Sequence, residues 1–170
     1  AVANAGGNDK AFLYDSTGDD MFYGREAYSY LYGNTFSNYA YGFDNVYAYA
    51  NAGGNDKAYL YDSAGDDMFY GRSAYSYMTG SNFYNFAHGF NDVYAYANAG
   101  GNDNAYLYGS DGDDSLWGGE NYSYLTGDGF YNFAHGFDRV NAYANNGGTD
   151  NSEPTITEAP TTVEPPTSIA

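Results

Sequence analysis

Short runs of the chain alternate a large aromatic residue with a small one. Tyrosine fills one row and Ala, Ser, Leu or Val fills the other in residues 58–61, 74–77 and 93–97. This period of two predicts β-strands, and we expect further short strands at 68–70 and 83–87. Turn-forming Gly, Asp and Asn separate these runs at 65–67, 71–72, 79–82 and 89–92. Helix formers are scarce between them, so we expect essentially no helix.

The whole pattern returns every 47 residues. The string Gly-Gly-Asn-Asp begins at Gly6, Gly53 and Gly100, and Gly147 opens a fourth, similar copy. Between the first two repeats 35 of 47 positions are identical, so the entire unit is kept rather than a few positions. A fixed period of this size is typical of solenoids, propellers and modular arrays.

We therefore predict an all-β fold, a parallel β-solenoid (β-helix) of three repeats with about two coils in each. Coils stacked at the strand spacing of about 4.8 Å would place equivalent residues of successive repeats about 10 Å apart, like above like. The alternative is a propeller-blade-like β-meander in each repeat, although three blades cannot close a ring within one chain. The predicted solenoid spans 1–150, with repeats at 6–52, 53–99 and 100–146.

Composition changes at about residue 151. All four prolines lie in 151–170, mixed with Thr and Glu without a period, so we expect an extended tail there. The tail is either a linker or stalk, or an arm that docks on another subunit. Residues 1–5 match 48–52 closely, so the chain opens within a repeat, and uncapped strand edges at both ends would invite another subunit.

The 23 tyrosines leave two orientations open. If the small row points inward, the core is a narrow stack of Ala, Val, Leu and Ser, and tyrosine ladders cover the outside. If tyrosine points inward, each coil must be wide enough for its hydroxyl to reach a backbone group. An outward row would exceed the apolar patches usual on a soluble monomer, so we expect it to be an interaction face.

Each repeat also carries two acidic motifs, Gly-Gly-Asn-Asp and, further on, Gly-Asp-Asp. Stacking would place Asp20, Asp67 and Asp114 in line, and their repulsion requires either solvent screening or a bound cation. Asp, Asn and Gly suit tight turns without any metal, whereas carboxylate and amide oxygens also suit calcium. The candidate calcium ligands are Asp9, Asp19, Asp20, Asp56, Asp66, Asp67, Asp103, Asp113 and Asp114.

Residues 107–119, Leu-Tyr-Gly-Ser-Asp-Gly-Asp-Asp-Ser-Leu-Trp-Gly-Gly, resemble the nonapeptide of RTX, or haemolysin-type, calcium-binding β-rolls. The string Leu-Tyr-Asp-Ser-x-Gly-Asp-Asp of the first two repeats is also similar to units of very large tandem-repeat surface proteins of aquatic bacteria. These resemblances imply secretion, a solenoid stabilised by calcium, and a structural or adhesive role.

The formal net charge of -17 makes nucleic acid and anionic membranes poor partners. The chain lacks cysteine, so neither disulfides nor thiolate metal sites hold the fold. No apolar run approaches the roughly 18 residues of a membrane-spanning helix. Divalent cations, polycations and neutral glycans remain possible partners.

Enzyme function is not expected. His88 and His135 occupy equivalent positions where the first repeat has Tyr41, and Gly119 replaces the arginine found at Arg25 and Arg72. We expect these residues to belong to a repeated surface, with the arginines pairing with nearby aspartates.

We predict a structural subunit of an extracellular filament, surface layer or adhesin shaft, at the cell surface. It would assemble head-to-tail with copies of itself and be stabilised by calcium. The alternative is a glycan-binding or adhesion module in which flat tyrosine faces stack on the sugar rings of a polysaccharide.

Overall fold

The computed structural model describes residues 1–4, 6–143 and 147–152, which form strands and turns without a helix. Each repeat supplies five strands in the same order. The first repeat contains β1 (Lys10–Tyr14), β2 (Met21–Gly24), β3 (Tyr28–Tyr32), β4 (Ser37–Tyr41) and β5 (Asn45–Tyr49). The second contains β6 (Lys57–Tyr61), β7 (Met68–Gly71), β8 (Tyr75–Thr79), β9 (Tyr84–His88) and β10 (Asp92–Tyr96). The third contains β11 (Asn104–Tyr108), β12 (Ser115–Gly118), β13 (Tyr122–Gly127), β14 (Phe130–His135) and β15 (Arg139–Tyr143), and β16 (Asn151–Ser152) follows.

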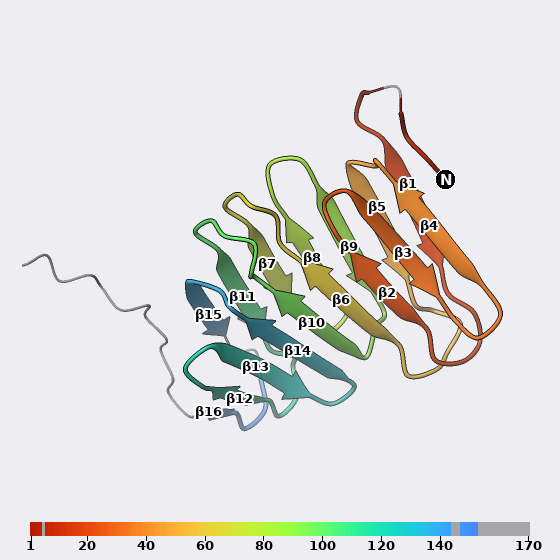
Figure 1. The fold of residues 1–170 in the computed structure, drawn as a ribbon. Coiled ribbons are helices and arrows are strands. Elements are labelled where there is room, and N and C mark those ends of the chain that lie inside the picture. The colour runs from red at the N-terminus through yellow and green to blue at the C-terminus, as the bar shows by residue number, and fades with distance from the viewer. Residues whose placement is uncertain (5, 144–146, 153–170) are drawn as a thin grey trace, which may run out of the picture.

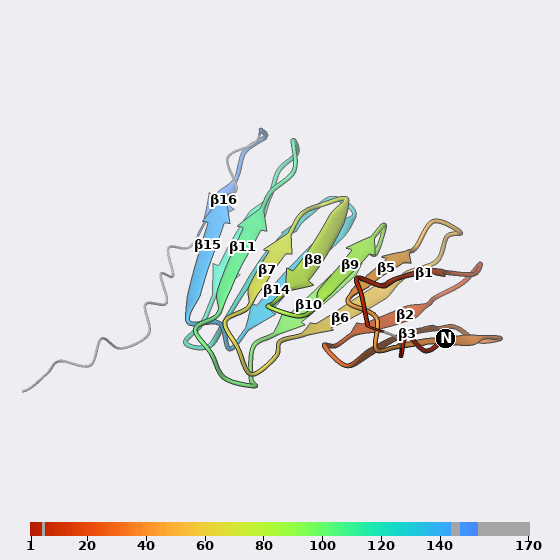
Figure 2. The ribbon, with the colours of Figure 1, turned by 90° about the horizontal axis from the view of Figure 1, so that it is seen from above.

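The strands form two sheets that pack face to face and are built up along one axis, from the N-terminal to the C-terminal repeat (Figures 1 and 2). The larger sheet, sheet A, has the order β16-β12-β13-β14-β10-β6-β2-β3-β4. Sheet B has the order β1-β5-β9-β8-β7-β11-β15. The predicted all-β solenoid of three repeats with stacked coils is therefore confirmed.

Most neighbouring strands are parallel, and the exceptions lie at one place in each repeat. The second, third and fourth strands of a repeat form an antiparallel meander, as in β2-β3-β4. A meander of this kind was the element expected by the propeller-blade alternative. Here its outer strands pair in parallel with neighbouring strands, for example β2 with β6, so the meander is part of a continuous sheet and not a separate blade.

Successive repeats alternate between the sheets. The first repeat places its meander in sheet A and its two flanking strands in sheet B, the second repeat does the opposite, and the third returns to the first arrangement. The chain crosses between the sheets three times per repeat, so each repeat makes about one and a half coils where about two were predicted. This odd number of crossings reverses the assignment each time. The expectation that equivalent residues of successive repeats stack directly, like above like, is wrong: they lie in opposite sheets, and the same sheet recurs after two repeats.

The small row of each strand points between the sheets and forms the core. Phe22, Leu31, Leu60, Phe69 and Leu107 are fully buried there, together with alanines such as Ala48 and Ala95. Burial of each large apolar side chain stabilises the fold by about 1.5 to 3 kcal/mol. The tyrosine row consequently points outward on both sheets, which answers the question of orientation that the sequence left open.

The predicted tail, 151–170, lies outside the described residues except for Asn151 and Ser152. These two residues pair in parallel with Ser115 and Leu116 of β12. Their register matches that of β11 on β7, so β16 occupies the place of the first strand of a fourth repeat.

Candidate functional site

The predicted calcium ligands divide into buried and exposed carboxylates. Asp19, Asp66 and Asp113 are exposed and Asp9 is half-buried. The remaining five have 1 to 2% of their surface exposed; they are Asp20, Asp56, Asp67, Asp103 and Asp114. A carboxylate so deeply buried must be hydrogen-bonded or neutralised, so its partners decide its role.

Asp67 shows the role of the Gly-Asp-Asp motif. Its carboxylate accepts hydrogen bonds from the backbone N–H of Ser63 at 2.6 Å and from the Ser63 hydroxyl at 3.0 Å, which closes the turn that precedes β7. The carboxylate also lies against Gly80, where an added Cβ would be 1.9 Å from Asp67 Oδ1. The same contacts recur in the other repeats, at Asp20 with Ser16 and at Asp114 with Ser110.

The two acidic motifs meet across the junction between repeats. The backbone N–H of Asp67 donates to Asp103 Oδ1 at 2.8 Å, and that of Asn102 donates to Asp66 Oδ1 at 2.9 Å. Equivalent bonds join Asp20 to Asp56 at 2.8 Å and Asp114 to Asp150 at 3.1 Å. The Gly-Asp-Asp turn of each repeat is therefore tied to the Gly-Gly-Asn-Asp or Gly-Gly-Thr-Asp turn of the next.

The predicted line of Asp20, Asp67 and Asp114 does not form, because β2 and β7, the strands they precede, lie in opposite sheets. The structure instead brings the predicted residues together in pairs. No cluster of three or more acidic or histidine side chains suited to a metal ion occurs among the residues that the structure describes. The buried carboxylates accept hydrogen bonds from backbone N–H donors, and these bonds stabilise the turns without a metal ion. Calcium binding stays a prediction from the sequence.

Burial raises the pKa of several of these carboxyl groups. Desolvation is the main cause at Asp103, whose pKa is raised to about 6, and the nearby Asp67, Asp62 and Asp138 act in the same direction. The hydrogen bond from the Asp67 backbone N–H opposes the rise. Desolvation likewise raises the pKa of Asp56 and Asp62. The junctions between repeats thus hold carboxylates that are poorly solvated when charged.

A second polar contact between repeats lies inside the core. Asn85 on β9 accepts a hydrogen bond from the Ser29 hydroxyl at 2.9 Å and donates one to the Arg25 carbonyl at 3.1 Å. Asn132 makes the same pair of bonds with Ser76 and with the Arg72 carbonyl. The equivalent Asn38 lies on the edge strand β4 and is exposed.

The sequence prediction missed this contact, which we name the Asn–Ser lock. Its signal was available, because Asn and Ser recur at 47-residue spacing on the inward, otherwise apolar row of their strands. Each lock joins the meanders of adjacent repeats across the two sheets, which the alternation of repeats brings face to face.

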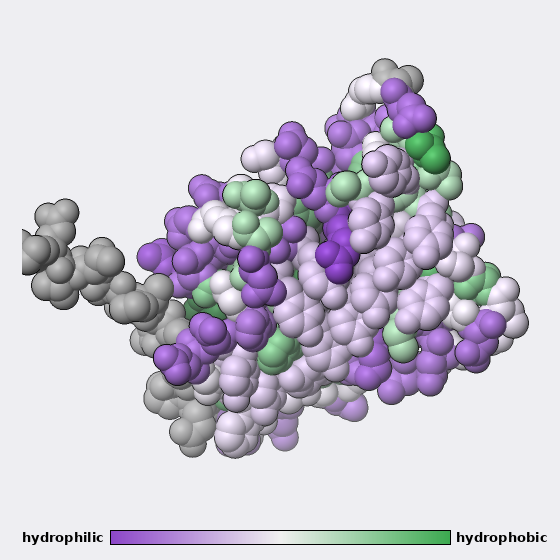
Figure 3. All heavy atoms as spheres, in the orientation of Figure 1, coloured by the Kyte–Doolittle hydropathy of each residue, from purple (hydrophilic) through white to green (hydrophobic). Residues whose placement is uncertain are grey.

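An unbroken row of aromatic residues crosses the outer face of sheet A. We name it the sheet A row; in spatial order it contains Tyr39, Tyr30, Tyr23, Tyr59, Tyr94, Phe133, Tyr124 and Trp117. In the first half of the row the rings are stacked, with centroids 4.7 to 5.1 Å apart. Figure 3 shows this face as a pale band between more hydrophilic margins.

Sheet B carries a shorter row of six aromatic residues, which ends where Asn141 faces Tyr106. Its members in spatial order are Phe12, Tyr47, Phe86, Tyr77, Tyr70 and Tyr106. Stacking is tight between Tyr70 and its two neighbours, at 4.7 and 4.8 Å, but the rings of Tyr47 and Phe86 are tilted by 51°. The sheet A row has the same break, because the rings of Tyr94 and Phe133 are tilted by 53°, so sheet A differs in having the longer aromatic face.

The predicted surface residues take their places on these faces. His88 and His135 lie on the outer faces, two residues along the strand from Phe86 and Phe133 of the aromatic rows. Each packs against that phenylalanine and against a tyrosine of the neighbouring strand. The arginines stack on rings instead of pairing with aspartates: the guanidinium carbon of Arg25 is 3.8 Å from the Tyr61 ring centroid, and that of Arg72 is 4.0 Å from Tyr108. The expected arginine–aspartate ion pairs are thus replaced by cation–π contacts.

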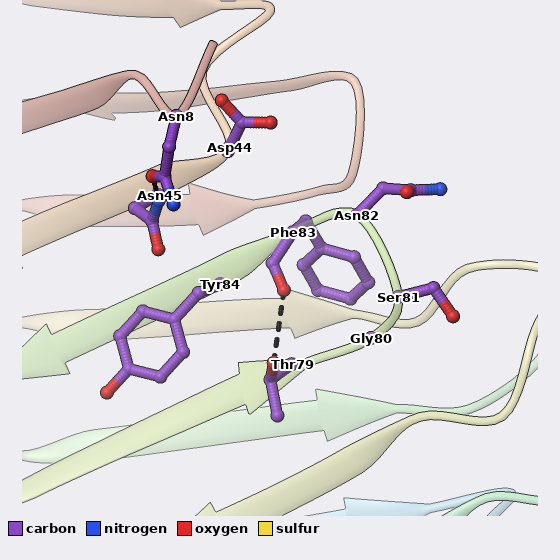
Figure 4. A pocket seen from close by; sticks show the side chains of 9 residues that line it. All are labelled: Asn8, Asp44, Asn45, Thr79, Gly80, Ser81, Asn82, Phe83 and Tyr84. Atoms are coloured by element: carbon purple, nitrogen blue, oxygen red, sulfur yellow. Dashed lines mark hydrogen bonds between the residues drawn. The ribbon is translucent and has the colours of Figure 1, made fainter.

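Two hollows accompany these surfaces. One of ≈ 370 Å³ lies beside sheet B, between the start of β5 and the β8–β9 turn, and polar groups such as Asn8, Asp44 and Asn82 line it (Figure 4). The Thr79 hydroxyl donates to the Phe83 carbonyl at 3.1 Å and closes that turn. The other hollow, of ≈ 580 Å³, lies between the edge strands β1 and β4 at the N-terminal end of the stack.

Among the described residues, no helix has the length and hydropathy of a membrane-spanning helix. No family model, no curated protein and no solved structure matches this chain. The function must therefore be argued from the geometry of the repeats.

Proposed function

We propose that this chain is a structural shaft, a rod segment that lengthens by adding repeats along one axis. The observation that carries the proposal is the set of contacts between successive repeats. The same backbone-to-carboxylate bonds and the same Asn–Ser locks recur wherever one repeat meets the next. A stack whose neighbours are joined by one repeated interface can be extended without a change of geometry.

The N-terminal end of the described stack supports extension by pairing of strands. At the N-terminal end Phe12, Tyr14 and Tyr39 are 53 to 61% exposed, whereas the equivalent Tyr59 and Tyr61 inside the stack are half-buried. This difference arises because a neighbouring strand is present in one case and not in the other. A preceding repeat or a second copy of the chain would cover the edge equally well.

A second copy must satisfy the alternation of repeats. Because the third repeat again places its meander in sheet A, a following copy continues the pattern only after a half turn about the axis. Its sheet B would then extend sheet A of the first copy, with its β1 in the place on β12 that β16 holds in the single chain, so β16 would have to be displaced. Such a head-to-tail contact does not close on itself and leads to a filament. Placement at the cell surface rests on the resemblance to secreted repeat proteins.

Sedimentation velocity over a range of protein concentrations tests self-assembly. We expect the sedimentation coefficient to rise with concentration, and Phe12→Glu at the exposed end to abolish the rise through charge repulsion. Tyr122→Glu is the matched control, because Tyr122 is 41% exposed on the outer face of sheet A, far from the N-terminal edge strands β1 and β4. A monomer at every concentration, with or without calcium, would contradict head-to-tail assembly.

A further inference from the structure

We propose that the outer face of sheet A is a binding surface for an extended, uncharged polysaccharide. The inference goes beyond the proposed shaft, because a shaft needs only its end-to-end contacts and not a continuous row of aromatic residues along its side. It begins with the distribution of charge, which is uneven in this strongly acidic protein.

The acidic side chains are absent from the strand faces. The 22 Asp and Glu residues lie in turns and in the tail, with one exception in the described strands, Asp92. Asp92 pairs with Lys57 on the adjacent strand at 3.2 Å, so this part of sheet A carries no net charge. Arg25, in the turn between β2 and β3, covers the Tyr61 ring. Apart from this one cation, the face of sheet A is thus neutral, and it is flanked by acidic turns.

This distribution selects the charge of the ligand. A polyanion would be repelled by the turns on either side of the face, and a polycation would bind to those turns instead. Each chain has a formal net charge of -17. Two copies placed face to face would therefore bring their acidic turns together, and these turns would repel each other. An uncharged ligand alone avoids both outcomes and still reaches the aromatic face.

The chemistry of the row selects an amphipathic ligand. Tyr23, Tyr30, Tyr59 and Tyr94 offer apolar ring carbons next to phenolic hydroxyls, which can donate hydrogen bonds at neutral pH. Sugars offer C–H patches beside hydroxyl groups and so match both parts. Because the inner rings already stack on each other, a sugar would contact ring edges and hydroxyls along the row, and not lie flat on single rings as the sequence led us to expect.

The geometry of the row selects a polymer. Eight aromatic residues follow one line perpendicular to the strands, with steps of 4.7 to 5.1 Å in the stacked half. Such a step is close to the length of one hexose unit in an extended chain, so successive sugars would meet equivalent side chains. A single sugar would contact only one or two of these rings, whereas a polymer adds many weak contacts.

The position of the only tryptophan gives the experiment its probe. Trp117 lies at the end of the sheet A row and is 48% exposed, so a ligand on the row should change its fluorescence. We would titrate the full chain with hydroxyethyl cellulose, a soluble neutral polymer, and with alginate as the acidic counterpart. Retention on insoluble cellulose, chitin, mannan and starch would be measured in parallel.

The variant that tests the row is Tyr59→Thr with Tyr94→Thr, which keeps β-branched, hydroxyl-bearing residues in the strands. The matched control is Tyr47→Thr with Tyr106→Thr, the same change on the outer face of sheet B. Circular dichroism and melting curves establish that both variants fold. We expect about a tenfold loss of retention for the sheet A variant and less than a twofold loss for the control.

Several outcomes would overturn the proposal. They are no retention on any of the four polymers, equal losses in the two variants, or a larger fluorescence change with alginate than with the neutral polymer. A fluorescence change that follows protein concentration without any polysaccharide, and that persists when Phe12→Glu blocks end-to-end contact, would instead identify a second copy of the chain as the occupant of the face.

Discussion

Replacement of Asp103 by Asn tests how the junctions between repeats are held. Asp103 is 2% exposed, and its pKa is raised from the ordinary 3.8 to about 6, chiefly by desolvation. A difference of about two pKa units corresponds to roughly 3 kcal/mol at neutral pH, at about 1.4 kcal/mol per unit. Asn keeps Oδ1 as acceptor for the Asp67 backbone N–H, and its neutral amide removes the repulsion from the neighbouring Asp67, Asp62 and Asp138 carboxylates. At the equivalent of Asp138, Asn91 already accepts such a backbone bond.

The sign of the pH dependence follows from the raised pKa. An acid whose folded pKa exceeds its unfolded value contributes stability that is fully present below pH 3.8 and is lost as the pH rises through about 6. The unmodified chain should therefore become more stable as the pH falls from 7 towards 4, and Asp103→Asn should remove part of that dependence. We expect the variant to be more stable than the unmodified chain by about 1 to 3 kcal/mol at pH 7, and equal to it near pH 4.

Urea denaturation at a series of pH values measures this difference. Asp128→Asn is the matched control, because Asp128 is exposed in the β13–β14 turn and its loss changes the net charge equally. A variant that is less stable than the unmodified chain at pH 7 would refute the reasoning. If that loss appeared only in excess calcium, it would show that the Asp103 carboxylate binds the ion, as the sequence led us to expect.

Three further changes test single contacts. Asn85→Ala should destabilise the fold by about 2 to 3 kcal/mol in urea titrations, because it leaves the buried Ser29 hydroxyl and the Arg25 carbonyl without this hydrogen-bond partner. Asn38→Ala, at the equivalent exposed position, should have almost no effect, and equal losses in the two variants would contradict the lock. Gly80→Ala should lower the melting temperature by several degrees, because its Cβ would be 1.9 Å from the buried Asp67 Oδ1. Gly65→Ala is the control, since its Cβ meets nothing closer than 3.8 Å. Equal melting temperatures for the two variants would show that the Asp67 carboxylate can move away freely. Chelator should leave the melting curve unchanged if the turns are held by hydrogen bonds alone, and a fall of several degrees would confirm the calcium prediction instead.

The fold class could be predicted from the sequence because the local patterns agree from one repeat to the next. Alternation in runs such as 58–61 predicts strands, which the structure places at β6 and its equivalents. The period of 47 residues predicts stacking of one unit on the next. The alternation between sheets was not predictable in the same way, because it depends on whether the number of crossings per repeat is odd or even. That number is set by the antiparallel meanders, whose strands look like any others in the sequence.

The candidate site was predicted in its residues but not in their partners. The repeated aspartates do lie at the turns, and five of the nine are buried. Their pairing, such as Asp67 with Asp103, joins residues 36 positions apart and follows from the stacking of coils, which the motif alone does not specify. The Asn–Ser lock was overlooked because we interpreted the inward row by its apolar members. Ser and Asn, each kept at its own position of the inward row in every repeat, were the signal for it.

Small-angle X-ray scattering of a chain lengthened by a second copy of residues 53–146 tests the shaft most directly. The insertion adds two whole repeats, and therefore five strands to each sheet and no net change in the alternation. At about 4.8 Å per strand, a solenoid shaft predicts a particle longer by about 24 Å with an unchanged cross-section. A thicker particle, or two bodies joined by a flexible segment, would contradict the claim that the repeats form one continuous rod.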